Sequence, residues 1–420
     1  MRQHLIKALY PAAVILLIVL CAACGGQHDV LTAGAACVNI SPENPAGLCL
    51  EGYTPRFSTG LHDSLSARCL VINDGTTNAV FVTLDLLGLL GSDMHTLAGR
   101  IQDETGTDTS SIFIHTTHTH SAPAMIGFNG SEVNIDYKRL VFDRTVTCVK
   151  QAIVAAKPAT IRIGSGVSHG VTVNRRNPDR PLDNELSVMD FRDSNGETIA
   201  TFVNFACHPV TQGPENTLLT ADFVYYLRRN VEAAHGGVTM FINGAIGDVN
   251  PKMPEEAVSD KDDPYAFSEI IGKVVGDDAL EILATAKEYP IRIRMATRTV
   301  LLPVENPMFL QIADMPAFEN PIENGRWKST ISIIDFGLAQ MLTIPGEALS
   351  GYRNALEPLL PGDHVFFSGL TNDCIGYIIP EAEWENASTR AYEEMVSLSG
   401  TLGSALEEEY TDLAGSLFSR

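Results

Sequence analysis

The sequence predicts a mixed α/β protein built as one large domain, in which mixed β-sheets are flanked by helices. Strand-like and helix-like runs alternate along the chain, without internal repeats or a low-complexity tract. A length of 420 residues with 45% hydrophobic content is ample for a large core. No convincing linker precedes the acidic C-terminal stretch "ALEEEYTDLAGSLFSR", so we expect a single domain over residues 36–420.

The first half of the chain predicts strands that surround one long helix. Residues 67–74 and 78–88 are apolar, β-branched runs bounded by turn residues such as "DG", and "SIFIH" is a third such run. A helix is expected over 136–158, where apolar residues recur at helical spacing until a proline. The strand "TIRIGSG" follows, and then a hairpin turning at residues 194–196.

The second half continues the alternation. A helix is expected within 264–289, followed by strands in "IRIRMATRTVLL", "STISIIDFG" and "AQMLTIPGE". A further helix is expected from about residue 347 to about residue 360.

The charge balance excludes some partners. The chain has 51 acidic and 29 basic residues, a formal net charge of −22. Nucleic acids and anionic membranes select for stripes of lysine and arginine, so neither is expected as the main partner. Solubility is the simplest explanation of the charge, and no obligate protein partner is evident.

The N-terminus predicts export. Basic residues in "MRQHLIK" precede the apolar run "ALYPAAVILLIVL", which is too short to span a bilayer comfortably. Small residues before Cys24 resemble a bacterial lipobox, which predicts a signal peptide over 1–24, a lipidated Cys24, a tether over 25–35 and anchoring in the bacterial cell envelope. Cys21 stands where leucine is usual, which leaves ordinary secretion open.

Six further cysteines would lie in a compartment that tolerates disulfides. Cys37 and Cys49 flank a short loop and are the best candidates for a bond, although cysteines in a core of this size are more often small buried hydrophobes. No cysteine belongs to a CxxC zinc pattern.

Three histidines lie within "SIFIHTTHTH". In an extended chain the side chains of His118 and His120 project from one face, whereas that of His115 projects from the opposite face. Two imidazoles on one face can hold a metal, or one can bind it while the other moves a proton. The "SAP" that follows predicts that the strand ends in a loop, where sites tend to lie.

Three other segments place polar residues at strand ends: His208 in "VNFACHPV", Glu347 in "MLTIPGEAL" and the turn "NGAIGDVNP". Catalytic zinc takes three protein ligands and leaves a position for water, so distant ligands favour an enzyme over a structural zinc module. Each residue also has a structural reading, because His208 can be a hydrogen-bonded strand-end histidine and Glu347 a first-turn helix carboxylate. Cys207 would point away from His208, which argues against a thiol protease.

Taken together, several motifs resemble those of the neutral/alkaline non-lysosomal ceramidases, zinc amidohydrolases that cleave the N-acyl bond of ceramide. In chain order they are "AGAACVNISP", "GLHDSLSARCLVI", "VFVTLDLLG", "THTHSAP", "NFACHPV", "GDVNP", "PGE" and "GLTNDCIGYIIP" followed by "AYEE". The resemblance runs from about Leu31 to about Gly400, which corresponds to the N-terminal catalytic domain.

The resemblance implies specific roles. His118, His208, Glu347 and Tyr377 would bind Zn²⁺. His120, Arg175 and Tyr392 would surround the substrate carbonyl, with Arg176 as the neighbouring alternative to Arg175. Hydrolysis by a zinc-activated water then needs no serine nucleophile.

Two departures from the family pattern bear on the substrate. Asn250 stands where neutral ceramidases carry a serine in "GDVSP", and no immunoglobulin-like domain follows the catalytic domain. The expected function is hydrolysis of ceramide or a related N-acyl lipid. Two alternatives stay open: hydrolysis of a soluble amide or ester, and a surface lipoprotein that keeps the scaffold for binding without catalysis.

Overall fold

The structure is a computed structural model that describes residues 31–419 except 181, 256–262, 291, 315–320 and 386–391. These residues belong to one compact unit, Leu31–Arg420. The proposed signal peptide lies outside the described residues, as does the first part of the expected tether. The first strand, β1, begins at Thr32, so the end of that tether belongs to a sheet.

The larger sheet has nine strands and mixes both pairing directions. Most neighbours are antiparallel, but β5 pairs with β6, and β10 with β12, in parallel. In sheet order the strands are β12 (Val238–Asn243), β10 (Thr198–Phe205), β9 (Glu185–Asp193), β7 (Lys157–Val167), β1 (Thr32–Asn39), β4 (Ser66–Asn73), β5 (Asn78–Leu84) and β6 (Ile112–Thr116), and β14 (Lys287–Tyr289) also pairs with β7.

Alternation along the strands gives this sheet two apolar faces. In β4, Cys69 and Val71 belong to one core cluster, whereas Leu70 and Ile72 belong to another. Successive side chains of a strand point to opposite faces, so a strand that is apolar throughout must be covered on both sides.

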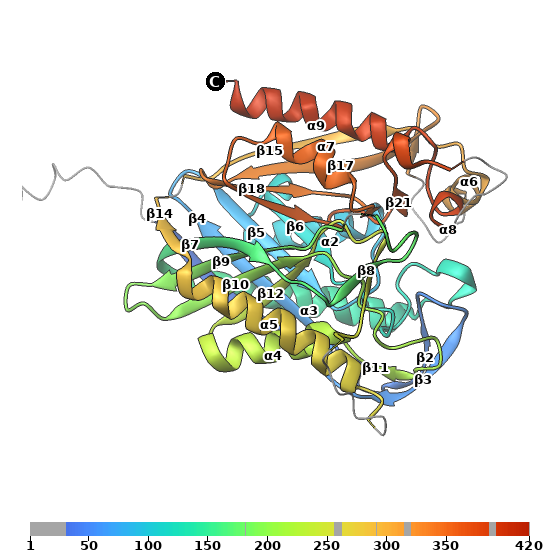
Figure 1. The fold of residues 1–420 in the computed structure, drawn as a ribbon, viewed down its shortest axis with the longest axis horizontal. Helices are drawn as coiled ribbons and strands as arrows, with labels where there is room; N and C mark the ends of the chain where they lie inside the picture. Colours follow the sequence, from blue (N-terminus) through green and yellow to red (C-terminus); the bar gives the residue numbers. More distant parts are fainter. Residues whose placement is uncertain are drawn as a thin grey trace, which may run out of the picture. The chain divides into compact units, whose positions relative to one another are not determined.

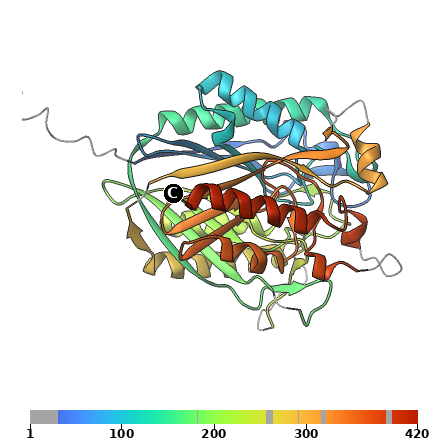
Figure 2. The same cartoon turned by 90° about the horizontal axis from the view of Figure 1, so that it is seen from above.

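Helices cover the first face in two pairs (Figures 1 and 2). The helices α2 (Gly91–Thr105) and α3 (Ile135–Val154) pack on β1, β4, β5 and β6. The helices α4 (Phe223–His235) and α5 (Ala266–Thr285) pack on β9, β10 and β12. The sequence predicted α3 and α5 but not α2 or α4.

A second sheet covers the other face. It consists of β15 (Arg294–Leu302), β17 (Arg326–Asp335), β18 (Ala339–Thr343) and β20 (His364–Ser368), with β16 (Ile322–Glu323) paired to β17. Phe336 of this layer lies beside Phe81, which also contacts Phe202 edge-to-face. The helices α7 (Tyr352–Leu356) and α9 (Leu402–Phe418) cover its outer face (Figure 1), so the unit has four layers and the predicted mixed α/β class is confirmed.

The C-terminal third adds one helix that the sequence analysis did not assign and corrects another. The acidic stretch at the C-terminus is helix α9, whose Leu406, Tyr410 and Leu413 are buried against the second sheet. The helix expected from residue 347 begins only at Tyr352, because Glu347 lies in the short strand β19 (Glu347–Ala348), which pairs with β21 (Tyr377–Ile378). The structural reading of Glu347 as a first-turn helix carboxylate is therefore wrong as well.

The remaining short elements are β2 (Ala46–Leu50), β3 (Arg56–Leu61), β8 (Thr172–Asn174), β11 (Leu218–Leu219), β13 (Val249–Pro251), α6 (Pro307–Ala313) and α8 (Tyr392–Met395), with 3-10 turns η1 (Thr109–Ser111), η2 (Phe128–Gly130), η3 (Glu357–Leu359) and η4 (Glu381–Glu383). In Figure 1, β2, β3, β11, α6 and α8 lie at one side of the unit.

The described cysteines are all free thiols, so the expected bond between Cys37 and Cys49 is wrong. Cys37 is exposed on β1 of the larger sheet, whereas Cys49 is buried on β2 of a separate three-stranded sheet. The reading of cysteines as small buried residues holds for Cys49, Cys69, Cys148 and Cys207.

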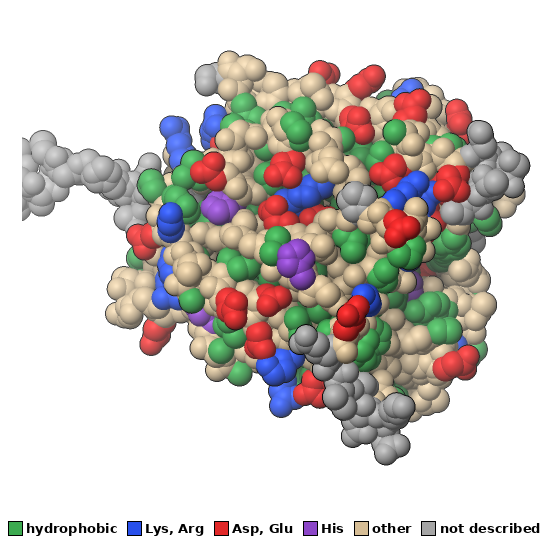
Figure 3. Space-filling view, in the orientation of Figure 1, with side chains coloured by type: hydrophobic (Ala, Val, Ile, Leu, Met, Phe, Trp, Pro, Cys, Tyr) green, Lys and Arg blue, Asp and Glu red, His purple; other side chains and the backbone are tan. Residues whose placement is uncertain are grey.

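The surface is charged without a broad single-sign patch on the face drawn in Figure 3, where acidic and basic side chains are interspersed. None of the described helices combines the length and apolar character needed to cross a bilayer.

Candidate metal centre

His118 is held in an unusual backbone conformation beyond the end of β6. Its φ of 71° is left-handed, which non-glycine residues adopt only where the surroundings enforce it. The segment after β5 enforces it, because the His118 backbone N–H donates to the Leu86 carbonyl at 2.9 Å and its Nδ1 lies 2.7 Å from the Leu87 carbonyl. The extended geometry expected here was therefore wrong, although the expected loop is present.

His208 lies just beyond β10 and is held in the same way. Its backbone N–H donates to the Val249 carbonyl at 3.0 Å, and its Nδ1 lies 2.8 Å from the Ile246 carbonyl. The glycine-containing turn thus positions His208. Gly247 is needed in that turn because a Cβ there would lie 2.7 Å from the Glu347 carbonyl oxygen.

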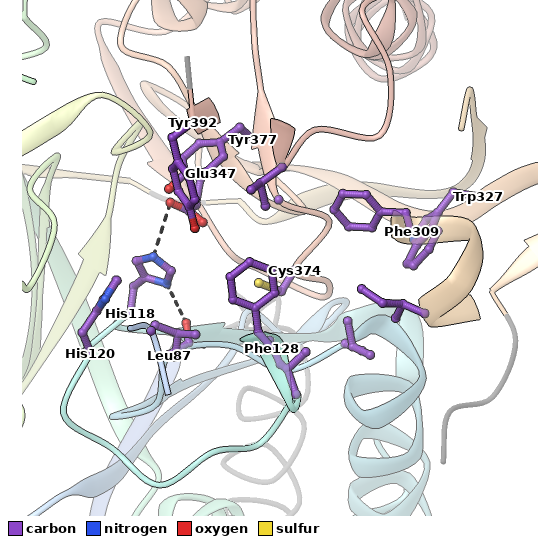
Figure 4. Close-up of a pocket in the computed structure, with 16 residues that line it drawn as sticks. Leu87, His118, His120, Phe128, Phe309, Trp327, Glu347, Cys374, Tyr377 and Tyr392 are labelled. Carbon is purple, nitrogen blue, oxygen red and sulfur yellow. Dashed lines mark hydrogen bonds and ion pairs between the residues drawn. The ribbon is translucent and has the colours of Figure 1, made fainter. Parts of the chain in front are cut away.

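Glu347 comes from the short strand β19, beyond the end of β18, and faces both histidines. Its Oε2 lies 3.0 Å from Nε2 of His208. The same oxygen lies 3.3 Å from Nε2 of His118 (Figure 4). Tyr377 is its register partner across β19 and β21. Three segments far apart in the sequence therefore meet at one buried point.

This convergence needs a positive charge. With Nδ1 of each histidine donating to a carbonyl, both Nε2 atoms carry lone pairs and face a carboxylate oxygen. Burial, reinforced by Arg175, lowers the pKa of His208 to about 4 although Glu347 opposes the shift. Burial alone would raise the pKa of Glu347. The opposing effect of His118 and His208 is larger, so the pKa lies well below its usual range. Imidazole nitrogens beside an ionised carboxylate are the donor set of a metal site, and carbonyl-bound Nδ1 atoms are typical of metal-ligating histidines.

The His120 side chain lies beside this group, and no hydrogen bond from a described residue fixes its ring. Its ring centroid is 5.0 Å from that of His118 and 5.9 Å from that of His208. Both ring nitrogens are buried without a hydrogen-bond partner among the described residues. Burial, together with the two neighbouring imidazoles, lowers its pKa well below the usual range. The candidate ligand atoms of all three histidines lie within 4.8 Å of one another, so the group can hold a metal.

Arg175 and the two tyrosines close the other side of the site. The Arg175 guanidinium donates to Tyr377 Oη at 2.9 Å and to Glu393 Oε1 at 2.9 Å. The Tyr377 and Tyr392 rings are 5.8 Å apart. Burial and the Glu347 carboxylate raise the pKa of Tyr377 well above its usual range, although Arg175 opposes the shift. Arg176 instead pairs with Glu394, which distinguishes the two neighbouring arginines.

A narrow apolar pocket opens from the site. His118, His120, Glu347, Tyr377 and Tyr392 line its polar end, and Phe309 and Trp327 lie at the other end (Figure 4). Its apolar lining is Leu87, Leu90, Ile126, Phe128, Phe309, Ile312, Trp327, Cys374 and Val396.

The structure brings together all seven residues singled out from the sequence. His208 and Arg175 do not line the pocket themselves. His208 contacts the pocket residue Glu347, and Arg175 donates to the pocket residue Tyr377. His115 has a structural role, because its Nδ1 lies 2.7 Å from the Gly369 carbonyl and its Nε2 accepts from the Asn243 N–H.

The sequence analysis missed Glu51 and Gly52. The buried Glu51 carboxylate accepts four backbone N–H groups from residues 125–128, the loop that carries Ile126 and Phe128 into the pocket. A Cβ on Gly52 would lie 2.5 Å from His120 Nδ1. The only local signal is a Glu-Gly pair after the strand-like run "GLCL".

Asn250 and Asp248 lie behind the site. Asn250 is not among the pocket-lining residues, and its Oδ1 is buried without a partner in the described part of the chain. Asp248 does more than organise its own turn, because its carboxylate accepts from the Ser350 N–H at 2.7 Å and from Asn174 Nδ2 at 2.6 Å. It thereby ties the glycine-containing turn to the segment after Glu347.

The fold and site define a mixed α/β protein with a buried histidine and carboxylate centre at the end of an apolar pocket. Residues 43–271 match the family described as "Neutral/alkaline non-lysosomal ceramidase, N-terminal". The neutral ceramidase of Pseudomonas aeruginosa is 25% identical over 237 residues, covering 49% of this chain and 34% of that protein. The neutral ceramidase of Drosophila melanogaster is 23% identical over 331 residues, covering 62% and 46%. The chain thus spans less than half the length of these relatives.

Solved structures agree with this assignment at the level of the fold. The crystal structure of neutral ceramidase from Pseudomonas aeruginosa superposes with a TM-score of 0.79 at 20% identity, covering 92% of this chain and 74% of that one. A structure described as "Ceramidase complexed with C2" gives a TM-score of 0.77 at 19% identity, with 92% and 75% coverage. The chain belongs to the neutral/alkaline non-lysosomal ceramidase family.

Proposed function

We propose that this protein is a zinc-dependent amidohydrolase that cleaves the N-acyl bond of ceramide or a related N-acyl lipid. The observation that carries the proposal is the convergence of His118 and His208 Nε2 on Glu347 Oε2 at the polar end of an apolar pocket. The family relation supports the same chemistry.

His118, His208, Glu347 and Tyr377 are the proposed zinc ligands. Nitrogen and oxygen donors from rigid strand ends suit Zn²⁺, and the carbonyl-bound Nδ1 atoms fix which imidazole nitrogen faces it. His120 lacks such a carbonyl partner, which favours a role toward the substrate over a role as a ligand. When bound, Zn²⁺ would supply Lewis acidity and lower the pKa of a bound water to about 7.

The remaining groups have roles in proton transfer and charge stabilisation. His120 is neutral and unanchored, so it can accept a proton from water and return it to the departing amine. The Arg175 guanidinium and the Tyr392 hydroxyl can donate to the carbonyl oxygen as it gains negative charge. One such donor typically contributes about 3 kcal/mol to the barrier reduction.

The pocket favours a lipid substrate over the two alternatives. Its lining is mostly apolar, and burying one methylene in such surroundings is worth about 0.8 kcal/mol. A soluble, polar amide would not contact this apolar surface. A protein that only binds would need neither His120 nor Arg175 beside the metal ligands.

The test is hydrolysis of a short-chain ceramide together with metal analysis. We expect about one zinc per chain, release of fatty acid, loss of both on chelation and recovery on adding Zn²⁺. His118→Ala should contain no zinc and release no fatty acid. Turnover that survives complete zinc removal would contradict the mechanism, and binding of ceramide without turnover of any amide would favour the non-catalytic lipoprotein.

We also propose export and anchoring through a lipidated Cys24, on the N-terminal pattern alone. Mass spectrometry of the mature N-terminus tests this directly. Cys24→Ser should abolish the lipid mass and move the protein from the membrane to the soluble fraction. An unlipidated N-terminus after another residue would support ordinary secretion.

A further inference from the structure

The turn between β2 and β3, residues 51–55, lies against the His120 side chain. Its Gly52 approaches so closely that a Cβ there would lie 2.5 Å from His120 Nδ1. The ring centroid of the next residue, Tyr53, is 4.9 Å from that of His120, with the two ring planes tilted by 54°. Aromatic rings attract each other in tilted arrangements at centroid distances of about 4.5–7 Å. Two successive residues of one turn therefore surround the imidazole to which the proposed function assigns proton transfer.

The orientation of the His120 ring depends on this packing, because hydrogen bonds do not fix it. Neither ring nitrogen has a partner among the described residues, whereas Nδ1 of His118 and Nδ1 of His208 each lie against a backbone carbonyl. A base must be oriented toward the proton that it accepts. The rings beside the imidazole are those of Tyr53, His118 and His208, and only the ring of Tyr53 belongs to no proposed zinc ligand.

Arg56, the first residue of β3, fixes both partners of the Tyr53–His120 contact. Its Nη2 donates to the His120 carbonyl at 2.6 Å, and its Nε donates to the Asn216 carbonyl at 2.8 Å. Its guanidinium carbon lies over the Tyr53 ring, 4.9 Å from the centroid. A planar guanidinium can donate to two carbonyls and stack on an aromatic face at the same time. Arg56 thus ties the backbone of His120 to the ring that packs on the His120 side chain.

Tyr53 makes this contact through its ring and not through its hydroxyl group. The hydroxyl donates to the Gln212 carbonyl over a long distance of 3.4 Å. Burial and the Asp222 carboxylate raise the pKa of Tyr53 to about 12, although Arg56 opposes the shift, so the phenol stays protonated at neutral pH. Tyr53 is also not among the residues that line the apolar pocket. A role in positioning therefore fits Tyr53 better than a role in proton transfer or substrate binding.

We propose that Tyr53 is a positioning residue that holds the His120 imidazole in the orientation needed for proton transfer, and that Arg56 fixes both groups. Because it explains how a residue of the same site is held, this inference rests on the proposed amidohydrolase function. The contact acts through shape, so another aromatic ring of the same size at position 53 should serve as well.

The kinetics of three variants on a short-chain ceramide test the proposal. Tyr53→Leu should lower kcat roughly tenfold or more, because the base is no longer held in the reactive orientation. Its KM should stay within about twofold of the wild-type value, with about one zinc per chain, because Tyr53 neither lines the pocket nor is a proposed ligand. Tyr53→Phe keeps the ring and should retain at least about half of the wild-type kcat. Phe57→Leu is the matched control, because Phe57 lies on β3 and is 57% exposed, and it should change neither kcat nor KM.

Crystal structures of the wild-type protein and of Tyr53→Leu test the positioning without any turnover. We expect the His120 ring of the variant to adopt another orientation or to lack defined density, while His118 and His208 stay in place. Arg56→Lys is the second variant if Tyr53→Leu does not fold. Its single nitrogen cannot replace both carbonyl contacts, so kcat should fall about threefold or more at constant KM, again with a displaced His120 ring. If the wild-type protein hydrolyses no amide, the proposed function fails, and the crystal structures alone decide the positioning role.

Several results would overturn the inference. A wild-type kcat in Tyr53→Leu, or an unmoved His120 ring in its crystal structure, would show that the aromatic ring is not needed. An equal loss of kcat in Tyr53→Phe would assign the effect to the hydroxyl group. A rise in KM in place of a fall in kcat would make Tyr53 a binding residue. An equal loss of kcat in Phe57→Leu would show that the effect comes from the general packing of β3.

Discussion

Nε2 of His208 lies 3.0 Å from Oε2 of Glu347, although 139 residues separate them in the chain. One comes from the end of a strand in the larger sheet and the other from a short strand beyond the second sheet. The two sheets are packed face to face, so the contact is rigid and both side chains are buried. This pairing underlies the first prediction.

His208→Ala should abolish both zinc retention and turnover. The substitution removes one proposed ligand and leaves the Glu347 carboxylate with one imidazole fewer. Zinc content by mass spectrometry should fall from about one per chain to below a tenth, with no measurable release of fatty acid. Asn250→Ser is the control, because Asn250 does not line the pocket, and it should keep its zinc and change only rate or selectivity. Loss of zinc from the Asn250 variant would contradict that placement.

Gly52→Ala should impair catalysis while zinc stays bound. The added Cβ would lie 2.5 Å from His120 Nδ1, and the φ of 98° adds backbone strain. His120 must move, so kcat should fall at least tenfold while zinc content is unchanged. Gly47→Ala is a matched control, because Gly47 has a φ of 84° but open space around its Cβ position. Gly47→Ala should lower stability by about 1 kcal/mol and leave kcat intact. Equal kcat values for the two variants would contradict the role given to this contact.

Glu51→Gln should loosen the pocket loop. Each Glu51 oxygen accepts two backbone N–H groups, and the glutamine NH₂ would face two donors in place of an acceptor. An unsatisfied buried donor costs about 1–3 kcal/mol, so the free energy of unfolding should fall by at least that amount. Because the loop carries Ile126 and Phe128, KM for a long-chain substrate should rise more than kcat falls. If the variant has the same free energy of unfolding and the same KM as the wild-type protein, the loop does not depend on this carboxylate.

Asp373 should make stability depend on pH. Burial raises its pKa to about 6, although hydrogen bonds from Ser329 and the Cys374 and Gly91 amides oppose the shift. The folded state therefore keeps a proton that the unfolded chain releases near pH 4. The free energy of unfolding falls as pH rises through this window, by roughly 3 kcal/mol for a shift of about two units.

Asp373→Asn tests this sign. An asparagine oxygen can still accept from both amides while its nitrogen donates to Ser329, so these three contacts survive without the charge and only the long 3.4 Å contact from Trp327 Nε1 is lost. The variant should gain stability over wild type at pH 7.5 and lose that advantage at pH 4.5, as measured by urea denaturation. Asp103→Asn, on the exposed side of α2, should change neither value. A constant difference at both pH values would contradict the assignment.

Much of the fold was predictable because local patterns and tertiary structure agree. Apolar β-branched runs became β4, β5 and β6, and helical spacing became α3 and α5. The helix α2 was not predicted, because glycine and charged residues interrupt its apolar pattern. The helix α4 was missed although Phe223, Leu227 and Val231 recur at helical spacing. The helix α9 was not assigned either, because its buried face, with Leu406 and Tyr410, is interrupted by exposed carboxylates.

The sequence by itself singled out the candidate site residues, because "THTHSAP", "NFACHPV" and "PGE" stand at strand ends and resemble the motifs of one family. It could not determine how they meet. The left-handed backbone of His118, the approach of Gly52 to His120 and the clamp of Glu51 on the pocket loop all depend on contacts between segments far apart in the chain. Only the packing of two sheets decided those distances, because local preference sets strands and helices whereas buried contacts between layers set where their ends converge.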